Sequence, residues 1–267
     1  MTAPAKVWDY RNLITNLVLR NLRARYKKSL LGWGWSLINP AVTLGIYTIV
    51  FGLFLSGEAP ALGNGDKGIF ALWLFAALVG WGAFNGGITT VMSSFLDSGH
   101  LLTRTYFPPE CPVIAGTLTV SIQTAIETAI LVVFMAVLGN LGWTTIFVIP
   151  VMVLLTLLSF GVGLMVSLGN VRFRDINYLV GIALQIAFYA TPIVYRLDQL
   201  PEKVSWMKTL LGFNPMTHFV TATRDVTYLL TMPTLTNWAV MVGSTAAVVG
   251  FGWWVFSRKA PRYIEEI

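Results

Sequence analysis

Long runs of uncharged, mostly apolar residues constrain this chain more than any other feature of its sequence. No charged residue lies between Lys28 and Glu58, and between Cys111 and Val171 only Glu127 is charged. An α-helix rises ~1.5 Å per residue and the hydrocarbon core of a bilayer is ~30 Å thick, so one crossing requires about 20 such residues. Only 11% of the 267 residues are charged, whereas about 25% are charged in a soluble domain. The sequence therefore predicts an all-α integral membrane protein.

Breakers within the uncharged runs divide them into six predicted transmembrane helices. The expected spans cover residues 34–55, 69–92, 112–138, 144–168, 176–195 and 235–256. Six crossings place both ends of the chain on the same side of the membrane. The single cysteine, Cys111, excludes an intrachain disulfide and is expected to act as small apolar filler.

The distribution of Lys and Arg over the predicted loops sets the orientation, because cytoplasmic loops are enriched in both residues. With the N-terminus inside, 13 of the 18 Lys and Arg residues lie on the cytoplasmic side. The outward residues are Lys67, Arg196, Lys203, Lys208 and Arg224. We therefore expect both termini in the cytoplasm. The net charge of +6 is explained by this asymmetry and by anionic lipid headgroups, so it indicates no nucleic-acid partner.

Residues 8–30, ahead of the first span, form a predicted amphipathic helix. Its polar stripe consists of Asp9, Asn12, Asn16, Arg20, Arg23 and Lys27, and Arg25 and Lys28 add further cations. The other faces are mostly apolar, with Leu13, Ile14, Leu17, Val18, Leu19 and Leu22. Such a helix lies in the headgroup plane with its apolar side down. The pattern alone fits either a simple lipid-surface anchor or a contact with a partner.

The segment from Arg25 to Pro40, RYKKSLLGWGWSLINP, resembles the N-terminal hallmark of permease subunits of polysaccharide-exporting ABC transporters. The residues that carry the likeness are Gly32, Trp33, Trp35, Asn39 and Pro40. Supporting matches are YTIVFG from Tyr47, RFRD from Arg172 and NPM from Asn214. The family comprises the Wzm and TarG type proteins, which export O-antigen, teichoic acid or galactan, and the chain is similar in particular to the mycobacterial-type galactan exporters. The resemblance implies one permease domain over residues 1–267 that exports a lipid-linked polysaccharide across the bacterial plasma membrane.

The resemblance also implies partners. Family members work as two permeases with two cytoplasmic ATPase subunits, so we expect a C2 homodimer with the channel on its axis. No Gly-Lys pair occurs in the sequence, although a phosphate-binding loop of the G-x-x-x-x-G-K-[ST] type requires one. ATP and Mg are therefore expected in the ATPase, and no cofactor and no catalysis in this chain.

Other functional classes fit the sequence less well. A membrane-embedded enzyme needs clustered acids, a metal site or an activated nucleophile, and the chain has neither D-x-D nor H-E-x-x-H. An ion channel or ion-coupled carrier usually has several intramembrane ionisable groups, and only Glu127 qualifies. Export of another amphiphile, a lipid or a drug, by the same ABC arrangement is the main alternative.

The cytoplasmic loop 97–110 begins with cap-forming residues and ends at a double proline, so it accommodates a short helix. By the resemblance this is the coupling helix that contacts the ATPase. The expected contact residues are His100, Leu101, Arg104, Tyr106 and Phe107. The alternative interpretation is a plain connecting loop.

Gln123 and Glu127 lie one helical turn apart on the same face of the third span. A carboxylate at this depth costs at least about 2.5 kcal/mol to insert, so it should face protein or water. The sequence leaves two interpretations open, a hydrogen-bonded contact between spans or a proton or substrate site.

Two further regions are singled out for the cargo. Aromatic rings within the first and fifth spans are candidates for a glycan path, because sugar C–H faces stack on aromatic rings; they are Tyr47, Phe51, Phe188 and Tyr189. Outward residues 196–230 are too apolar for a free loop, yet each half is too short to cross, which predicts two re-entrant helices. By the resemblance this region is the external gate, with Trp206, Phe213, Asn214 and Pro215. Packing at the membrane interface is the alternative.

Overall fold

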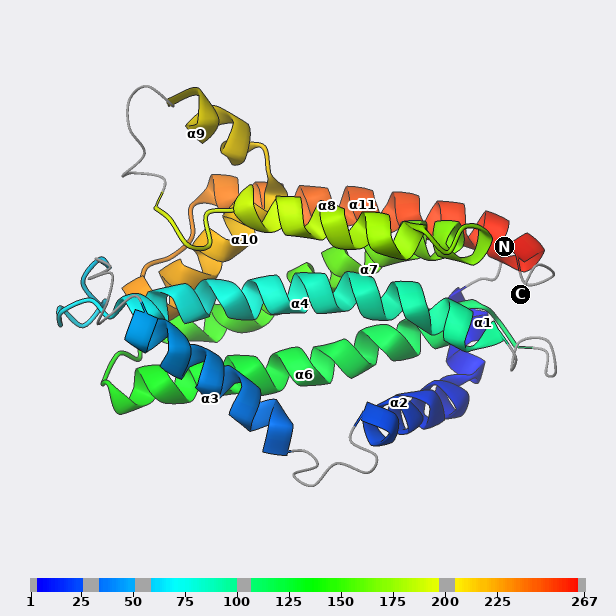
Figure 1. Ribbon diagram of the computed structural model, residues 1–267, viewed down its shortest axis with the longest axis horizontal. Helices are drawn as coiled ribbons and strands as arrows, with labels where there is room; N and C mark the ends of the chain where they lie inside the picture. Colours follow the sequence, from blue (N-terminus) through cyan, green and yellow to red (C-terminus); the bar gives the residue numbers. More distant parts are fainter. Residues whose placement is uncertain (1–3, 26–33, 51–58, 100–106, 197–204, 264–267) are drawn as a thin grey trace.

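The computed structural model describes residues 4–25, 34–50, 59–99, 107–196 and 205–263. All regular structure within these ranges is helical, which confirms the predicted class (Figure 1). The elements are α1 Pro4–Asp9, α2 Arg11–Arg25, α3 Trp35–Tyr47, α4 Phe70–Asp97, α6 Glu110–Val137, the 3-10 helix η3 Trp143–Phe147, α7 Val148–Arg172, α8 Ile176–Tyr189, α9 Ser205–Gly212, α10 Pro215–Arg224, the π-helix η5 Asp225–Leu229 and α11 Leu235–Tyr263.

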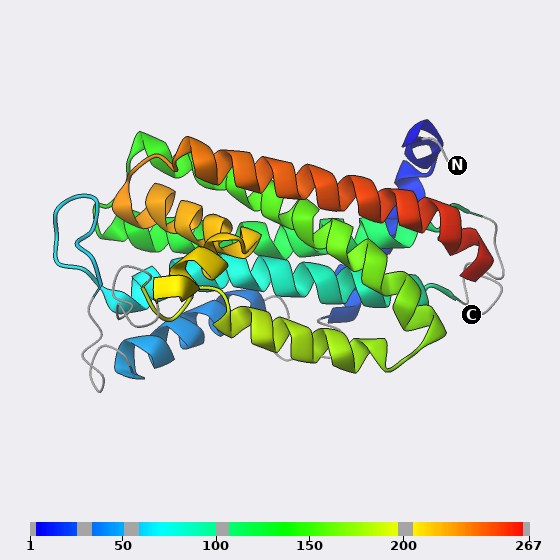
Figure 2. The ribbon, with the colours of Figure 1, turned by 90° about the horizontal axis from the view of Figure 1, so that it is seen from above.

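Among the residues that the structure describes, four segments are long and apolar enough to cross a bilayer, so the chain is an integral membrane protein. They are Phe70–Asp97, Glu110–Val137, Trp143–Arg172 and Leu235–Arg262, which correspond to the expected second, third, fourth and sixth spans. The helices α3 and α8 have only 13 and 14 residues, or about 20 Å at 1.5 Å per residue. Figure 2 shows α8 running along the bundle, and Figure 1 shows α3 crossing it at a tilt.

Several helix ends differ from the sequence prediction. The helices α7 and α11 continue to Arg172 and Tyr263, beyond the expected residues 168 and 256. The helix α8 ends at Tyr189 rather than at residue 195, because Ala190–Thr191–Pro192 forms a turn and proline disfavours helical geometry in the residue before it. The helix α4 continues five residues beyond the expected end, to Asp97. The hydroxyls of Ser93 and Ser94 both donate to the carbonyl oxygen of Thr90, so this polar turn stays helical.

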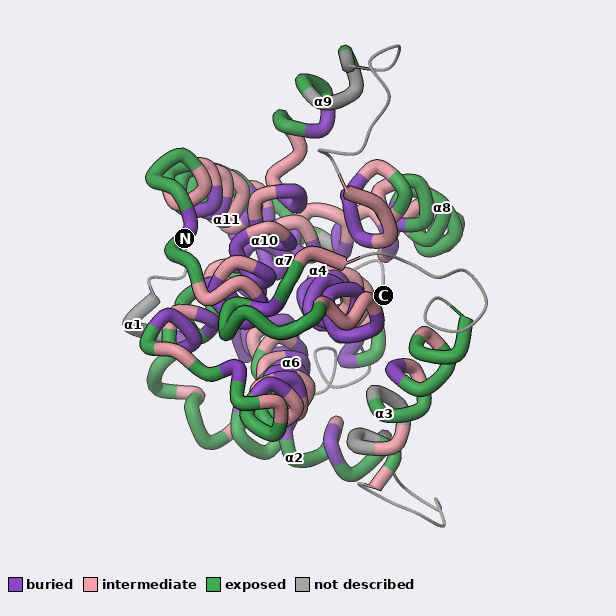
Figure 3. The backbone as a smooth tube through the Cα atoms, turned by 90° about the vertical axis from the view of Figure 1, so that its left-hand side faces the viewer, coloured by how far each residue is buried: buried purple, intermediate pink, exposed green. Residues whose placement is uncertain are grey.

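The helix α4 lies at the centre of the bundle, packed against α6 and α7, and α7 packs in turn against α11 (Figure 3). In the most apolar window of α4, 72% of the residues are buried, against 22% in α6 and in α11. Small residues permit these approaches: a Cβ on Gly87 of α4 would collide with Oγ of Ser159, and one on Gly252 of α11 would collide with the backbone of Gly161. Such close packing drives helix association in lipid, where the hydrophobic effect between helices is absent.

The two ends of the bundle are named here by what they contain. The terminal end holds α1, α2 and the C-terminal part of α11, and the loop end holds the segments 59–69 and 138–143 (Figures 1 and 2). A cluster of buried apolar side chains joins α2 to α4, α6, α7 and α11 at the terminal end. Within it the rings of Phe95 and Phe256 meet edge to face, 5.2 Å apart, and Cys111 is completely buried as expected.

The predicted amphipathic helix consists of two helices, α1 and α2, separated at Tyr10. The expected polar residues Asn12, Asn16, Arg20 and Arg23 of α2 are exposed, and Ile14, Leu17, Val18 and Leu22 are buried. Leu19, which was expected on the apolar side, is 42% exposed. The buried face of α2 packs against α6, so α2 rests on protein.

Candidate functional site

One face of α4 carries small and polar residues in an otherwise apolar helix. The residues are Gly82, Asn85, Gly86, Thr89, Thr90, Ser93 and Asp97, and we call this row the polar track. Their spacing of three or four residues places them on one face, and all are exposed or half-buried, whereas the rest of α4 is largely buried in the bundle. Polar groups within a membrane span face protein, water or cargo rather than lipid. The track is therefore the strongest candidate for a transport path.

The pair Gln123 and Glu127 of α6 lies beside this track. Nε2 of Gln123 donates to Oε1 of Glu127 at 2.9 Å, so the two side chains share a face as expected. A Cβ built on Gly82 would lie 3.4 Å from Oε2 of Glu127, which places the carboxylate against the backbone of α4. The hydrogen bond lies within α6 and the carboxylate packs against α4, so the two interpretations, a contact between spans or a proton or substrate site, both stay open.

A row of aromatic rings connects α4 to α8. The ring centroid of Trp81 lies 5.8 Å from that of Phe84 and 5.5 Å from that of Phe188, and Phe188 lies 5.3 Å from Tyr189 at an interplanar angle of 90°. Two of the expected path residues, Phe188 and Tyr189, are thus brought together. Tyr47 is half-buried on α3, and Phe51 lies outside the described residues. Trp81 and Phe84, which extend the row, were not singled out from the sequence.

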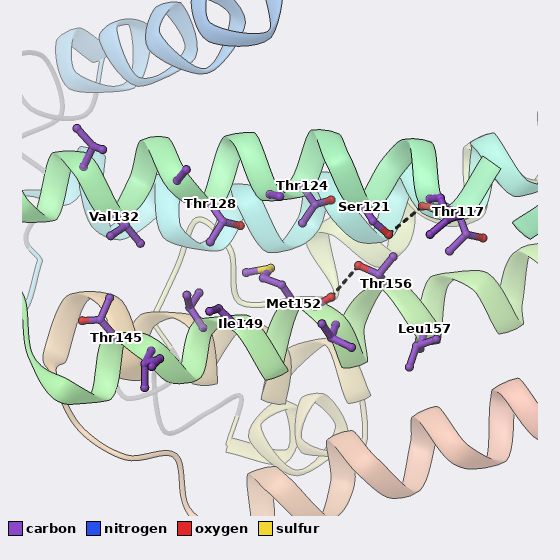
Figure 4. A pocket seen from close by; sticks show the side chains of 17 residues that line it. Thr117, Ser121, Thr124, Thr128, Val132, Thr145, Ile149, Met152, Thr156 and Leu157 are labelled. Carbon is purple, nitrogen blue, oxygen red and sulfur yellow. Dashed lines mark hydrogen bonds between the residues drawn. The ribbon is translucent and has the colours of Figure 1, made fainter. Parts of the chain in front are cut away.

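A groove of about 680 Å³ lies between α6 and α7 (Figure 4). The polar groups in its lining are hydroxyls, and several bond within their own helices: Ser121 donates to the carbonyl of Thr117 at 2.9 Å, and Thr156 to that of Met152 at 2.7 Å. The remaining lining is hydrocarbon, including Leu118, Val133 and Ile149. Because its lining is largely hydrocarbon, the groove suits hydrocarbon better than a glycan, although Oγ1 of Thr128 in that lining has no hydrogen-bond partner. No residue of the polar track lines it.

A buried arginine organises the loop end. Arg224 of α10 is only 6% exposed, and its guanidinium donates to three carbonyl oxygens, those of Trp73 at 3.1 Å, Pro192 at 2.7 Å and Ile193 at 2.6 Å. Its Cζ also lies 3.2 Å from the ring centroid of Trp73. Charge-assisted bonds and stacking of this kind compensate for taking a cation out of water. Arg224 was expected from the sequence among the outward loop cations, and its burial at this junction was missed.

A buried asparagine ties the loop between α6 and η3 to η5. Asn140 is fully buried, and its Nδ2 donates to the carbonyl oxygens of Thr227 at 3.1 Å and Tyr228 at 2.9 Å. Its Oδ1 accepts from the backbone N–H of Asn64 at 3.0 Å. Asn140 was not singled out from the sequence, so this role was missed.

Tyr228 connects the same region to the segment before α4. Its hydroxyl donates to the carbonyl oxygen of Pro60 at 3.0 Å and accepts from the N–H of Ile69 at 2.9 Å. The surrounding segment η5 is π-helical and is followed by Leu230 in the left-handed region, at φ 55°. π-Helical turns are rare and are frequent at functional sites.

The expected gate residues fall into two groups. The side chain of Asn214 caps α10 by accepting from the N–H of Met216 at 3.0 Å, and it donates to the carbonyl oxygen of Ala190 at 3.1 Å. Pro215 occupies the first turn of α10, as is common at helix starts. Trp206 and Phe213 are instead 63% and 79% exposed. Asn214 and Pro215 therefore fix the fold, and the two aromatic side chains remain available to other molecules.

The remaining expected residues are only partly described. His100, Leu101, Arg104 and Tyr106 of the coupling loop lie outside the described residues, as do Lys27, Lys28, Gly32 and Trp33. Phe107 is buried in the terminal-end cluster, where it anchors the end of the loop. Trp35 is 45% exposed at the start of α3. Arg25, Asn39 and Pro40 lie within α2 and α3, and only their backbone is described.

Residues 12–228 match the family model of the ABC-2 type transporter, which is well over half of the chain. The chain belongs to the ABC-2 type transporter family. In this ABC-2 transporter the matched region extends from α2 to η5, so it contains the polar track, the aromatic row and the loop-end hydrogen bonds.

Curated relatives of this ABC-2 transporter are similar over most of their length. The O-antigen export system permease protein RfbA of Klebsiella pneumoniae is 29% identical over 224 residues, covering 82% of this chain and 80% of the relative. A protein of the same name from Myxococcus xanthus is 25% identical over 264 residues, or 98% of each chain. The polysialic acid transport protein KpsM of Escherichia coli is 24% identical over 214 residues, or 78% of each.

Proposed function

We propose that this chain is the transmembrane permease subunit of an ATP-driven exporter that moves a lipid-linked polysaccharide out of the cytoplasm. The observation that carries the proposal is similarity over 78% to 98% of the chain to proteins named for O-antigen export and polysialic acid transport. The polar track and the aromatic row fit such a cargo. Sugar hydroxyls can exchange hydrogen bonds along the track, and sugar faces can stack on the rings of Trp81, Phe188 and Tyr189.

In this proposal the whole chain, residues 1–267, is one permease domain with six crossings and both termini in the cytoplasm of a bacterium. The four long spans contribute four crossings, and α3 and α8 supply the other two together with residues that flank them. The position of α1 and of the end of α11 at the same end of the bundle supports an even number of crossings (Figure 1). The loop end then faces outward, and the terminal end faces the cytoplasm.

The working unit is a C2 homodimer that encloses the path between two copies. Support comes from α8, in which Leu184 is the only residue classed as buried. Its exposed surface includes Gln185 and the rings of Tyr178 and Tyr189. Polar groups on a membrane helix favour protein or water over lipid, so this face suits a partner copy and the path between the copies.

Energy comes from a separate cytoplasmic ATPase, in two copies, which binds ATP and Mg; this chain catalyses no reaction and carries no cofactor. The motor contacts the loop 97–110 at the terminal end. Phe107, buried in the terminal-end cluster with Phe95 and Phe256, supports this role because it connects the loop to α4 and α11.

The external gate comprises α9, α10 and η5, with α9 and α10 as re-entrant helices. The exposed rings of Trp206 and Phe213 stand on or next to α9, while Asn214 and Arg224 fix α10 at its two ends. This arrangement supports a mobile α9 on an anchored α10.

Conditional depletion of the protein in its own host tests the function. We expect an undecorated cell surface and accumulation of polysaccharide on its lipid carrier at the cytoplasmic face, measured by extraction and sugar analysis of the lipid fraction. Depletion of the companion ATPase should cause the same lipid-linked polymer to accumulate, and re-expression of the wild-type chain should remove the accumulated polymer. If polymer export is unchanged and another lipid or a drug is retained instead, the proposal is wrong and the protein exports that amphiphile.

A further inference from the structure

A polar pocket of about 250 Å³ lies between α2, α4 and α6 at the terminal end of the bundle. Its lining consists of Leu17, Arg20, Asn21, Ala24, Thr90, Ser93, Ser94, Asp97, Ser98, Pro112 and Thr119. The pocket lies where α4 ends and α6 begins, beneath the amphipathic helix α2. The helix α4 ends at Asp97 and α6 begins at Glu110, so the pocket lies near the ends of two long apolar spans, where phospholipid headgroups meet such helices.

The two charged side chains of the lining have opposite signs and belong to different helices. Arg20 comes from α2 and Asp97 is the last residue of α4; both are exposed, and no ion pair joins them within the part of the chain that the structure describes. The guanidinium of Arg20 reaches Oδ1 of Asn21 only at 3.4 Å, which is long for a hydrogen bond. Separated opposite charges around one pocket are complementary to a ligand that carries both signs.

The hydroxyls of the lining add polarity but few available donors. Oγ of Ser94 donates to the carbonyl oxygen of Thr90 at 2.6 Å, and Oγ1 of Thr119 donates to that of Ala115 at 2.8 Å. A neutral sugar would need several donors as well as acceptors from these walls. Arg20, Asn21 and Asp97 therefore determine which ligand the pocket selects.

We propose that this pocket binds the headgroup of a zwitterionic phospholipid with a primary ammonium group, its phosphate on Arg20 and its ammonium on Asp97. A guanidinium forms charge-assisted hydrogen bonds to phosphate oxygens, and a carboxylate accepts them from an ammonium. Phosphatidylethanolamine provides both groups. Phosphatidylglycerol has no cation to offer Asp97, and the quaternary ammonium of phosphatidylcholine cannot donate a hydrogen bond. The bound lipid joins α2 to α4 at the terminal end of the polar track, whose residues Thr90, Ser93 and Asp97 line the pocket.

Native mass spectrometry of the full-length chain, stripped of lipid and titrated with equimolar phosphatidylethanolamine and phosphatidylglycerol of identical acyl chains, tests the proposal. The wild type should retain phosphatidylethanolamine preferentially. Asp97→Asn should shift the ratio of the two bound lipids toward phosphatidylglycerol by roughly three- to fivefold, and Arg20→Gln should weaken both lipids. All of the substituted side chains are exposed, so the variants should fold like the wild type.

Matched controls separate this pocket from general attraction to lipid. Arg23→Gln removes an exposed cation of α2, and Asp9→Asn removes an exposed carboxylate of α1; neither residue lines the pocket. Both controls should leave the lipid ratio unchanged. An equal ratio for wild type and Asp97→Asn, or equal effects of Arg20→Gln and Arg23→Gln, would overturn the proposal. Displacement of the lipid by a soluble oligosaccharide would also overturn it, because the pocket would then take glycan.

Discussion

Both ends of the bundle have buried apolar clusters, but they differ in their buried hydrogen bonds. At the loop end, buried polar side chains bond to backbone groups distant in sequence: Arg224 reaches carbonyl groups 31, 32 and 151 residues away, and Asn140 reaches Thr227, 87 residues away. At the terminal end, apolar side chains of α2, α4, α6, α7 and α11 form a cluster in which rings such as those of Phe95 and Phe256 pack edge to face.

The difference in buried hydrogen bonds determines how easily the helices at each end can move relative to one another. Buried hydrogen bonds are directional and costly to break, so they hold one arrangement, whereas packed apolar helices can slide by small amounts without losing their contacts. Small relative movements of helices are therefore easier at the terminal end, where the ATPase is proposed to act. The loop end supports the proposed gate on a fixed base. Three substitutions at the loop end test this contrast.

The largest effect is expected for Arg224→Leu. It leaves three buried carbonyl groups without their charged donor, which should lower the free energy of unfolding by about 3–5 kcal/mol. Thermal unfolding of the purified protein in detergent measures the loss. Arg258→Gln is the matched control, because Arg258 also lies over an indole, 4.6 Å from the ring centroid of Trp254, but is exposed.

Hydrogen exchange then shows which backbone amides lose protection in the variant. In Arg224→Leu, amides at the start of α4 should lose protection, while those of α2 at the terminal end should keep it. Equal loss of protection at both ends would contradict the proposed difference between them, since the two ends would then unfold as one unit.

A smaller effect is expected for Asn140→Ala. The substitution removes two donated bonds and one accepted bond at a fully buried position, at a cost of about 2 kcal/mol. Asn177→Ala, at an exposed position on α8, is the control. An unfolding temperature that is the same for both variants would show that the hydrogen bonds of Asn140 contribute no net stability.

The smallest effect is expected for Asp225→Asn, which should change how the stability of the protein depends on pH. Burial raises the pKa of the Asp225 carboxyl from 3.8 to about 6, against the opposing charge of Arg224. Because the folded pKa lies above the unfolded one, the stabilisation is present at low pH and is lost as the pH rises through about 6. Relative to Asp225→Asn, the wild type should lose roughly 1 kcal/mol between pH ~4 and ~7, since Asp225 is partly exposed.

Unfolding temperatures of the two proteins across this pH range measure the difference. Asp175→Asn, which removes an exposed carboxylate before α8, is the control. A gap between wild type and Asp225→Asn that stays constant with pH would exclude a raised pKa for Asp225.

The sequence located the long spans because their signal is local. A charge-free run of about 20 residues is sufficient to identify a crossing, and α4, α6, α7 and α11 all begin within a few residues of the expected positions. The C-terminal ends of the helices were harder to predict. The turn at Pro192 shortens α8, and α4 is longer than expected through a turn in which Ser93 and Ser94 bond to the carbonyl of Thr90. The same local reasoning paired Gln123 with Glu127, which are one helical turn apart.

The candidate site was only partly predictable. The polar residues of α4 are visible in the sequence, but their importance depends on which face of α4 the rest of the bundle leaves uncovered. Arg224 and Asn140 bond to segments tens of residues away, and no local pattern encodes such partners. The one available signal was a single cation inside the apolar run that ends at Leu230.

The burial of Cys111 gives this protein a practical property. It is the only cysteine of the chain, and it has no exposed surface among the side chains of the terminal-end cluster. Thiol-directed labels therefore find no native target on the folded protein, so a cysteine placed at an exposed position such as Trp206 or Leu235 becomes the sole attachment point. Spectroscopic probes can then test whether α9 opens as proposed, in a background that needs no prior mutation.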